Sequence, residues 1–333
     1  MKRLKGLYIM EARSFARVYG VEEQRDIAKQ VEIIGGPQTR ESIGTRAELL
    51  AEAEVIFSGW GAPLMDEAFL KAAPRLRAVF YGAGTTGYFT TEAFWAREIA
   101  LSSAYAANAL PVAEYALGAI LLSLRNFWSY AALARGGAEW PGTDAPMPGG
   151  FRSTVSLIGC GMIARRLIAL LKPFDLRVLV HDPFLDDYEA AKLGVERCTL
   201  EEAFRLADIV SLHAPNKAET RGLVGREHFL SMRRRATFLN TARGPIIRED
   251  ELVEALRARP DLTAILDVCV QEPPPAGSPL FTLPNLILTP HIAGSHDGEL
   301  RRLGRYMVEE LERFVRGQEL RWRITRELSA RLA

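Results

Sequence analysis

Cysteine is scarce in this sequence, and neither charge is in excess. The 333 residues include only three cysteines, Cys160, Cys198 and Cys269, whose spacing matches no metal site and which cannot all pair. Such usage favours a reducing, cytoplasmic setting. Lysine and arginine together number 42 and aspartate and glutamate 41, which leaves a formal net charge of +1. We therefore expect no general attraction to nucleic acid or to an anionic membrane surface.

Long apolar runs are lacking as well. No run approaches the roughly 18 apolar residues that suggest a membrane span. The apolar stretch near the N-terminus is cut short by Glu11 and Arg13, unlike a signal peptide. No cluster of histidine, cysteine and carboxylate residues has metal-ligand spacing, so we predict no metal. What remains is an ordinary globular composition, 48% hydrophobic, in a chain long enough for two domains.

Short apolar runs alternate with helical patterns over the first third of the chain. Strands are expected at residues 6–10, 31–34, 55–58, 77–81 and 101–104, with helices at 47–53 and 66–73. A long apolar helix is predicted over residues 110–125. The glycine- and proline-rich stretch that follows, residues 136–150, contains Trp140 and is typical of a loop or arm, either disordered or lying on a partner subunit.

The pattern becomes regular from residue 154 onward. Six apolar runs lie at residues 154–158, 177–180, 209–212, 237–240, 263–266 and 286–288, mostly separated by helical segments, as in a doubly wound parallel sheet. An amphipathic helix at 298–316 precedes a possible strand at 321–325 that returns to the first domain. We predict an α/β fold with two Rossmann-like lobes. A doubly wound parallel-sheet domain at 106–294 is inserted into a flavodoxin-like domain made of residues 1–105 and 295–333.

The first of these six runs ends in two glycines, Gly159 and Gly161, with a helical segment behind them. The second run ends close to Asp182, about 20 residues further on, and Ala164 is the small residue at the third position. This is the fingerprint of a dinucleotide-binding βαβ unit, in which the pyrophosphate lies on the helix N-terminus. The structural alternative is a tight strand-to-helix turn without a ligand, with Asp182 as a cap.

The acid at the end of the second run also indicates which dinucleotide binds. The Asp182 carboxylate can accept hydrogen bonds from both ribose hydroxyls of NAD and would repel a 2′-phosphate. Residues 183–185 include no arginine that could neutralise such a phosphate. We therefore predict NAD as the cofactor, with NADH preferred over NADPH.

Three later strand ends carry groups suited to hydride transfer to a 2-oxo acid, and all would emerge at the carboxyl edge of the sheet. Arg243 offers a planar, permanently charged donor to a carboxylate. His291 can supply a proton to the carbonyl oxygen, and Glu272 can hold its far nitrogen and favour the imidazolium form. Asp267 can accept from the cofactor's carboxamide. Each also has a structural alternative, such as a solvated turn, a loop end or a capped histidine.

With these residues in view, the chain resembles the D-isomer-specific 2-hydroxyacid dehydrogenase family over nearly its full length. The matching pieces are residues 112–114, 159–164 with Asp182, 213–215, 240–244, 267–273 and 289–291. The resemblance implies that Arg243 binds substrate, that Glu272 orients His291, and that His291 is the general acid and base. It also implies a homodimer paired through the nucleotide domain, with the Trp140 region as an arm, and a substrate domain built from residues 1–105 and 295–333.

The fingerprint and the resemblance together define the expected ligand contacts. The predicted cofactor contacts are Gly159, Gly161, Met162, Ile163, Asp182, His213, Pro215, Thr241, Ala242 and Asp267. The resemblance implies that the backbone of Gly82, Ala83 and Gly84 binds the substrate carboxylate. His181, His213 and His228 are otherwise interpreted as structural, and the role of His296 is left open.

The identity of the acid depends on residues 58–63, which lie where the family contacts the substrate side chain. This loop contains Trp60 and no arginine or lysine. We therefore expect Trp60 to offer an apolar wall to the substrate, and the substrate to be an unphosphorylated 2-oxo acid such as glyoxylate, hydroxypyruvate or a bulkier apolar one. The alternatives are a phosphoglycerate dehydrogenase, whose common extra regulatory domain we do not expect here, and an NAD(H)-sensing, corepressor-like binding protein. A formate dehydrogenase is disfavoured because glutamine would then replace Glu272.

Overall fold

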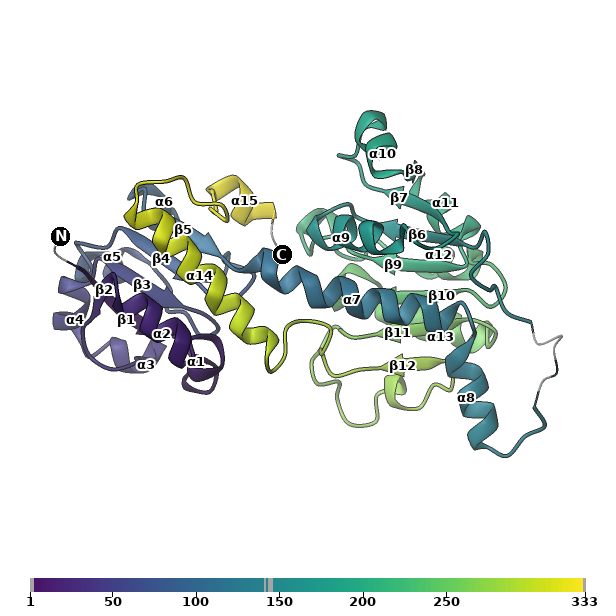
Figure 1. Cartoon of the computed structure of the whole chain (residues 1–333). Coiled ribbons are helices and arrows are strands. Elements are labelled where there is room, and N and C mark those ends of the chain that lie inside the picture. The colour runs from purple at the N-terminus through teal and green to yellow at the C-terminus, as the bar shows by residue number, and fades with distance from the viewer. Residues whose placement is uncertain (1–2, 141, 143–145, 332–333) are drawn as a thin grey trace. The chain divides into compact units, whose positions relative to one another are not determined.

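The computed structural model describes residues 3–140, 142 and 146–331, and the chain divides into two compact units (Figure 1). Unit 1 consists of Met1–Asn108 and Ser295–Ala333, and unit 2 of Ala109–Gly294. Each unit is built on one parallel sheet covered on both faces by helices. The predicted fold class is confirmed, because consecutive strands are joined by crossovers in both sheets.

Unit 1 contains the five strands expected from its apolar runs. They are β1 (Leu4–Ile9), β2 (Val31–Ile33), β3 (Val55–Ser58), β4 (Ala78–Tyr81) and β5 (Ala100–Ser103). All neighbours are parallel, in the order β2-β1-β3-β4-β5. This is the flavodoxin-like order of doubly wound sheets, in which ligands bind at the carboxyl ends of the strands.

The two faces of this sheet bury alternate residues of each strand, as the two-residue period of a strand requires. Leu7 and Ile9 of β1 face one hydrophobic core, and Tyr8 faces the other. The first core is closed by α3 (Arg40–Ile43), α4 (Ala47–Glu52), α5 (Glu67–Ala72) and α6 (Glu92–Ala96). The second is closed by α1 (Ala12–Val18), α2 (Val21–Ala28) and α14 (Glu299–Val315).

The C-terminal part of the chain returns to unit 1 mainly as a helix. The amphipathic pattern at 298–316 forms α14, and its apolar stripe is buried. The strand expected at 321–325 is wrong: only Arg323 pairs with β5, in a single antiparallel bridge, and α15 (Arg326–Arg331) follows. The buried Glu310 carboxylate accepts the N–H groups of Arg321 and Trp322, which therefore do not join a strand ladder.

Unit 2 contains the six expected strands and one more. They are β6 (Thr154–Ile158), β7 (Arg177–His181), β8 (Glu196–Arg197), β9 (Ile209–Leu212), β10 (Thr237–Asn240), β11 (Thr263–Leu266) and β12 (Leu286–Leu288). The order is β12-β11-β10-β9-β6-β7-β8, which is the Rossmann order with an additional edge strand. In this order β12 is the additional edge strand. The strand that was not predicted is β8, at the other edge of the sheet; it consists of two exposed charged residues, so no apolar run marks it in the sequence.

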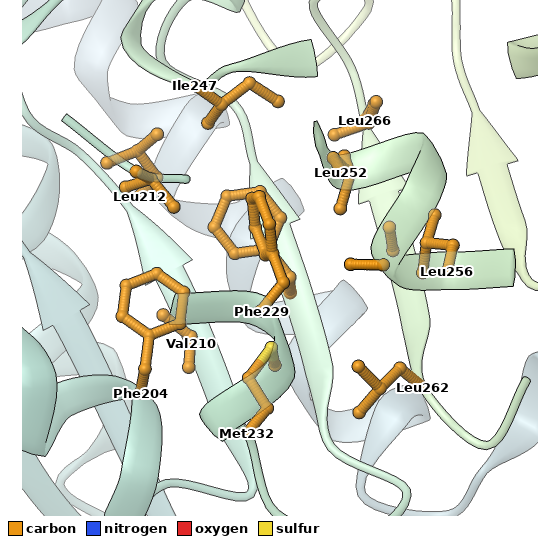
Figure 2. Packing of buried hydrophobic residues seen from close by; sticks show 14 of the residues in the cluster. Phe204, Val210, Leu212, Phe229, Met232, Ile247, Leu252, Leu256, Leu262 and Leu266 are labelled. Atoms are coloured by element: carbon orange, nitrogen blue, oxygen red, sulfur yellow. The ribbon is translucent and has the colours of Figure 1, made fainter. Parts of the chain in front are cut away.

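Helices cover both faces of the second sheet. One core is formed with α7 (Tyr105–Ser123), α9 (Met162–Leu171) and α10 (Asp187–Leu193). The other is formed with α11 (Leu200–Leu206), α12 (Arg226–Ser231) and α13 (Glu249–Ala258), where Phe204, Phe229 and Leu252 pack together (Figure 2). Short 3-10 helices lie at Ala218–Thr220, Gly244–Ile246 and Pro279–Phe281.

The helix α7 corrects two expectations. It begins at Tyr105 rather than residue 110, and by length and composition alone it is apolar enough to cross a membrane, although Pro111 and Glu114 interrupt its run of apolar residues. Its most apolar window is 56% buried within the protein, as is usual for a core helix of a globular domain. One such helix is weak support for a membrane span.

The segment between α7 and β6 begins with a helix that was not expected, α8 (Phe127–Arg135). The predicted arm at 136–150 is irregular where it is described, and Trp140 is 78% exposed. Residues 141 and 143–145 of this arm lie outside the described residues.

Candidate functional site

The turn after β6 has the backbone geometry that the fingerprint demands. Gly159 has a φ of 95°, and a Cβ there would lie 2.8 Å from the backbone nitrogen of Ala214, so only glycine fits. Gly161 caps the N-terminus of α9, and a Cβ on it would meet no described atom within 4 Å. Ala164 is fully buried in the first turn of α9. The open space beside Gly161 is what a closely approaching ligand requires.

Asp182 is tied directly to this turn. Its Oδ2 accepts a hydrogen bond from the N–H of Cys160 at 2.6 Å, and its Oδ1 accepts one from the N–H of Phe184 at 2.8 Å. The carboxylate therefore lies at the end of β7, beside the loop between Gly159 and Gly161. In dinucleotide-binding folds this is the place of the acid that binds the adenosine ribose.

Two buried polar atoms at the carboxyl edge have no partner within the described residues. They are Thr241 Oγ1, after β10, and Asn216 Oδ1, in the loop after β9. An unsatisfied buried polar group costs about 1–3 kcal/mol, so such atoms indicate a place for a polar ligand. Together with the open turn at Gly161, they fit an NAD molecule along this edge. Asn216 was not predicted, because nothing in the sequence marks a loop amide as buried.

The remaining predicted cofactor contacts lie along the same edge. Met162 and Ile163 form the first turn of α9, Pro215 follows β9, and Ala242 follows β10. His213 is hydrogen-bonded through Nε2 to Ser211 Oγ at 2.8 Å. Burial lowers the pKa of His213 to about 4, so its ring is neutral near pH 7. That contact agrees with a structural role for this histidine.

Arg243 is positioned by a rigid loop at the end of β10. The buried Asn240 accepts a hydrogen bond from the N–H of Ala242 at 2.9 Å and donates one to the carbonyl oxygen of Arg243 at 3.1 Å. Gly244 packs against the next loop so closely that a Cβ would lie 2.0 Å from the carbonyl carbon of Cys269. Burial lowers the pKa of Arg243 and the Glu272 carboxylate opposes this, which leaves the guanidinium charged at neutral pH.

His291 and Glu272 form a direct pair. Nδ1 of His291 donates to Oε2 of Glu272 at 2.7 Å, and Oε1 of Glu272 accepts from the N–H of Cys269 at 3.3 Å. Because a carboxylate can only accept, the proton of this bond belongs to Nδ1. The second nitrogen of His291, Nε2, has no partner among the described residues, and the side chain is 49% exposed. That nitrogen is therefore available to a substrate.

The loop that carries His291 is held by Asp267. Its buried carboxylate accepts from the hydroxyl of Thr289 at 2.6 Å and from the N–H groups of Ile292 and Ala293 at 2.8 and 2.9 Å. His291 itself has a φ of 55°, which is uncommon for a residue other than glycine. Its N–H lies 3.0 Å from the carbonyl oxygens of both Asp267 and Thr289. Asp267 thus already has three donors, and its contact with a cofactor stays a prediction.

A hydroxyl chain connects this loop to α7. The Thr289 hydroxyl donates to Asp267, so it must accept from the hydroxyl of Tyr115, 2.9 Å away. Neither Thr289 nor Tyr115 was predicted as part of the site. The two are 174 residues apart in the chain, and no sequence spacing could have paired them.

In unit 1, the loop after β4 carries the predicted contacts Gly82, Ala83 and Gly84. One of them needs correction: the N–H of Gly82 already donates to the carbonyl oxygen of Ser58 at 2.8 Å. The N–H groups of Ala83 and Gly84 have no acceptor among the described residues. The Ser103 hydroxyl lies 2.8 and 2.6 Å from the carbonyl oxygens of these two residues and holds the loop. Two backbone donors, rather than three, are therefore free.

The loop after β3 contains Trp60, which is partly buried and packs on both hydrophobic cores of unit 1. Its carbonyl oxygen accepts from the N–H of Glu11 at 2.8 Å. Arg40, from α3, donates Nε and Nη2 to the carbonyl oxygen of Ala62 at 3.2 and 2.7 Å. A guanidinium thus lies against residues 58–63. The sequence prediction missed it because only the loop itself was searched for positive charge.

The other histidines have local partners. His228 is buried and its Nδ1 accepts from the N–H of Gly225 at 3.1 Å, and His181 lies 3.2 Å from the carbonyl oxygen of Cys198. His296 belongs to unit 1, where its N–H donates to Glu299. Over the described ranges, no three histidine, cysteine or carboxylate side chains are grouped as a metal site.

The edge of the second sheet thus combines three capacities. Arg243 can bind a carboxylate, His291 can give or take a proton at Nε2, and the Gly159–Gly161 turn can receive the pyrophosphate of a dinucleotide. Such a set suits hydride transfer to or from a small acid.

Comparisons with known proteins agree with this chemistry. A family model described as "D-isomer specific 2-hydroxyacid dehydrogenase, NAD binding domain" matches residues 117–293. The chain is 30% identical to the D-3-phosphoglycerate dehydrogenase of Methanocaldococcus jannaschii over 298 residues, which cover 88% of this chain and 56% of that protein. It therefore spans only about half the length of the phosphoglycerate dehydrogenases it matches.

Two further relatives are matched over most of their length. The glyoxylate reductase of Korarchaeum cryptofilum is 30% identical over 276 residues, which cover 81% of this chain and 82% of that protein. A crystal structure of a phosphoglycerate oxidoreductase from Rhizobium etli has a TM-score of 0.80 at 25% identity and covers 97% of this chain and 99% of its own.

Proposed function

Because the chain belongs to the D-isomer specific 2-hydroxyacid dehydrogenase family, we propose that it is an NAD-dependent enzyme. Its reaction interconverts a D-2-hydroxy acid and its 2-oxo acid by hydride transfer. The observation that carries the proposal is the 2.7 Å bond between His291 Nδ1 and Glu272, which leaves Nε2 of His291 free. Arg243 lies close enough to Glu272 for the two charges to interact.

The residues of unit 2 divide the work of the reaction. NAD, when bound, supplies the hydride chemistry. The Arg243 guanidinium binds the substrate carboxylate, since it offers two parallel N–H donors and keeps its charge. His291 Nε2 donates a proton to the carbonyl oxygen during reduction and removes it during oxidation. Glu272 holds Nδ1–H and so keeps the opposite nitrogen directed at the reacting oxygen.

The cofactor would lie along the carboxyl edge of the second sheet. The Gly159–Gly161 turn would hold the pyrophosphate, and Asp182 would hold the ribose. Thr241 Oγ1 and Asn216 Oδ1, which have no partner among the described residues, would bind polar groups of the cofactor. The Asp182 carboxylate favours NADH over NADPH, because it would repel the 2′-phosphate of NADPH.

For the substrate we propose a small, unphosphorylated 2-oxo acid such as glyoxylate or hydroxypyruvate. Trp60 supports this, as an apolar wall within the loop at 58–63, and so does the glyoxylate reductase that is matched over most of its length. A specific observation favours the alternative, a phosphorylated acid: the Arg40 guanidinium lies against the same loop. Phosphates are commonly bound by arginine.

We also propose a homodimer, paired through the nucleotide domain and located in the cytoplasm. Several apolar side chains around the predicted arm are exposed, among them Trp140 at 78%, Phe151 at 71% and Phe127 at 44%. Clusters of large exposed apolar residues of this kind are typical of subunit interfaces.

The proposal is tested by following NADH oxidation with a panel of 2-oxo acids that includes glyoxylate, hydroxypyruvate, pyruvate, phenylpyruvate and 3-phosphohydroxypyruvate. NADPH is run in parallel, and NADH binding is measured separately by calorimetry. We expect turnover with one of the unphosphorylated acids. Tight NADH binding without turnover of any acid would contradict an enzyme and favour a dinucleotide-sensing protein.

A further inference from the structure

The cofactor preference predicted from Asp182 depends on a second residue that the sequence search overlooked. Asp182 accepts from the N–H of Cys160, and Arg165 donates from Nε to the carbonyl oxygen of the same Cys160 at 3.0 Å. The backbone of Cys160 thus binds the Asp182 carboxylate through its N–H and the Arg165 guanidinium through its carbonyl oxygen. An arginine is therefore present at the ribose end of the predicted site, although residues 183–185 contain none.

The charge of that arginine is already paired. Arg165 Nη2 donates to Oε2 of Glu189 on α10 at 2.6 Å. Both side chains are partly exposed, at 41% and 44%, so the pair contributes little to stability and its partners can separate at small cost. In NADP-binding relatives of this fold, a nearby arginine accommodates the 2′-phosphate.

We infer that Glu189 is a cofactor-selectivity residue: by pairing with Arg165 it keeps this guanidinium from a 2′-phosphate and so supports the choice of NADH. The inference rests on the proposed function, because it assumes that a dinucleotide binds at the Gly159–Gly161 turn. The proposed function explained the preference for NADH by the Asp182 carboxylate alone; here Glu189 and Arg165 also contribute to it. Asp182 and Glu189 together outweigh Arg165 by one negative charge, and the 2′-phosphate would add further negative charge to the same place.

Replacing Glu189 by glutamine leaves the shape of the pair and removes its charge. Arg165 then has no carboxylate partner except Asp182 and is free to meet a phosphate. We expect the Kd of NADPH to fall about tenfold, the change that ~1.4 kcal/mol produces. The Kd of NADH should change by less than about twofold, since NADH has no 2′-phosphate for the released guanidinium to bind.

The chain supplies a matched control. Arg177 and Glu196 form an ion pair of similar exposure, 47% and 57%, with hydrogen bonds of 2.6 Å from Nη2 and 3.0 Å from Nε. Arg177 begins β7, five residues before Asp182 and roughly 17 Å from it at ~3.3 Å per strand residue. Glu196 lies on the neighbouring strand β8, in register with Leu179, three residues before Asp182. Glu196→Gln therefore removes an equal charge from the same domain without affecting Arg165.

The experiment is calorimetric titration of the full chain with NADPH and with NADH, for the parent and for Glu189→Gln, Glu196→Gln and Arg165→Gln/Glu189→Gln. The expected result is a gain in NADPH affinity for Glu189→Gln alone. The double variant should lose the gain, and Glu196→Gln should match the parent. Thermal unfolding of each variant confirms that the domain is intact.

Three results would overturn the inference in different ways. If the parent binds NADH and Glu189→Gln leaves the ratio of the two dissociation constants within twofold, Glu189 does not select the cofactor, and the proposed function stands. If Glu196→Gln produces the same gain as Glu189→Gln, the effect is one of net charge. A parent that binds neither dinucleotide would overturn the proposed function itself, and this inference with it.

Discussion

The carboxyl edges of the two parallel sheets are built in different ways. In unit 2 the edge presents charged side chains, and other side chains hold them: Glu272 holds His291, and Asn240 holds the loop of Arg243. In unit 1 the edge presents two backbone N–H groups, an indole and an exposed guanidinium; the Ser103 hydroxyl holds the loop of the two N–H groups, and the other contacts are to backbone carbonyl oxygens. In the function we propose, unit 2 carries the chemistry, which needs fixed charges, and unit 1 selects the acid, which needs shape.

The largest effect should come from the side chain with the free nitrogen. His291→Ala removes the group that exchanges a proton with the substrate oxygen, and kcat should fall by about 10³, within the range of general acid–base catalysis. Steady-state assays measure the loss, and calorimetry should show that NADH still binds. A variant that reduces the acid at near the parent rate would remove His291 from the mechanism.

Replacing one glycine by alanine at each sheet edge should lower the free energy of unfolding much more in unit 2 than in unit 1. Gly244→Ala places a Cβ 2.0 Å from the backbone of Cys269, so the two loops must move apart, at a cost of about 3 kcal/mol of unfolding free energy. Gly84→Ala, in unit 1, meets no described atom within 4 Å and should change that free energy by less than about 0.5 kcal/mol. Urea denaturation followed by circular dichroism compares the two. Equal losses would mean that the edges are equally packed.

An intermediate effect is expected from the hydroxyl chain behind the catalytic loop. Thr289→Val removes a donor to the buried Asp267 and the acceptor of the Tyr115 hydroxyl, which should cost about 1–3 kcal/mol. The loop that carries His291 loosens, so kcat should fall more than NADH affinity does. Thr289→Ser keeps the hydroxyl and should retain most of the activity. If serine and valine behave alike, the hydroxyl does not position the loop.

The smallest effect should follow a change in unit 1. Arg40→Gln removes an exposed charge at residues 58–63 but leaves Trp60 in place. For an unphosphorylated acid, KM should change by less than about fivefold, because exposed charges contribute ~1 kcal/mol or less. Measuring KM for glyoxylate and for 3-phosphohydroxypyruvate decides between the substrates. A selective rise for the phosphorylated acid would reverse our order of preference.

Much of the architecture follows from local patterns in the chain. The eleven strands expected from apolar runs in the two sheets are present, because buried parallel strands appear in a sequence as short apolar runs between helical segments. The further strand expected at 321–325 is only a single bridge. The exceptions are instructive. Residues 8, 9 and 10 alternate between two cores, which an apolar run cannot reveal, and the polar strand β8 has no run at all.

The site was predictable to the extent that its residues follow strands. Arg243, Glu272 and His291 each come shortly after an apolar run, and parallel strands bring their carboxyl ends to one edge. Their supporting partners were not predictable. Tyr115 contacts Thr289, 174 residues away in the chain, and Arg40 of helix α3 contacts Ala62 in the loop after β3.

The sequence alone therefore determined the fold class and marked the glycine turn after β6 and the three side chains of the proposed site, since each is marked by residues that are neighbours in the chain. Only the tertiary structure decided which donors, acceptors and charges at these edges are already paired. The structure showed that the N–H of Gly82 already donates to Ser58 and that Asp267 holds the loop that carries His291. It also showed that Arg165 shares the backbone of Cys160 with Asp182 while it is paired with Glu189. Hydrogen bonds and ion pairs between distant segments depend on how the elements pack, and the spacing of residues along the chain does not determine that packing.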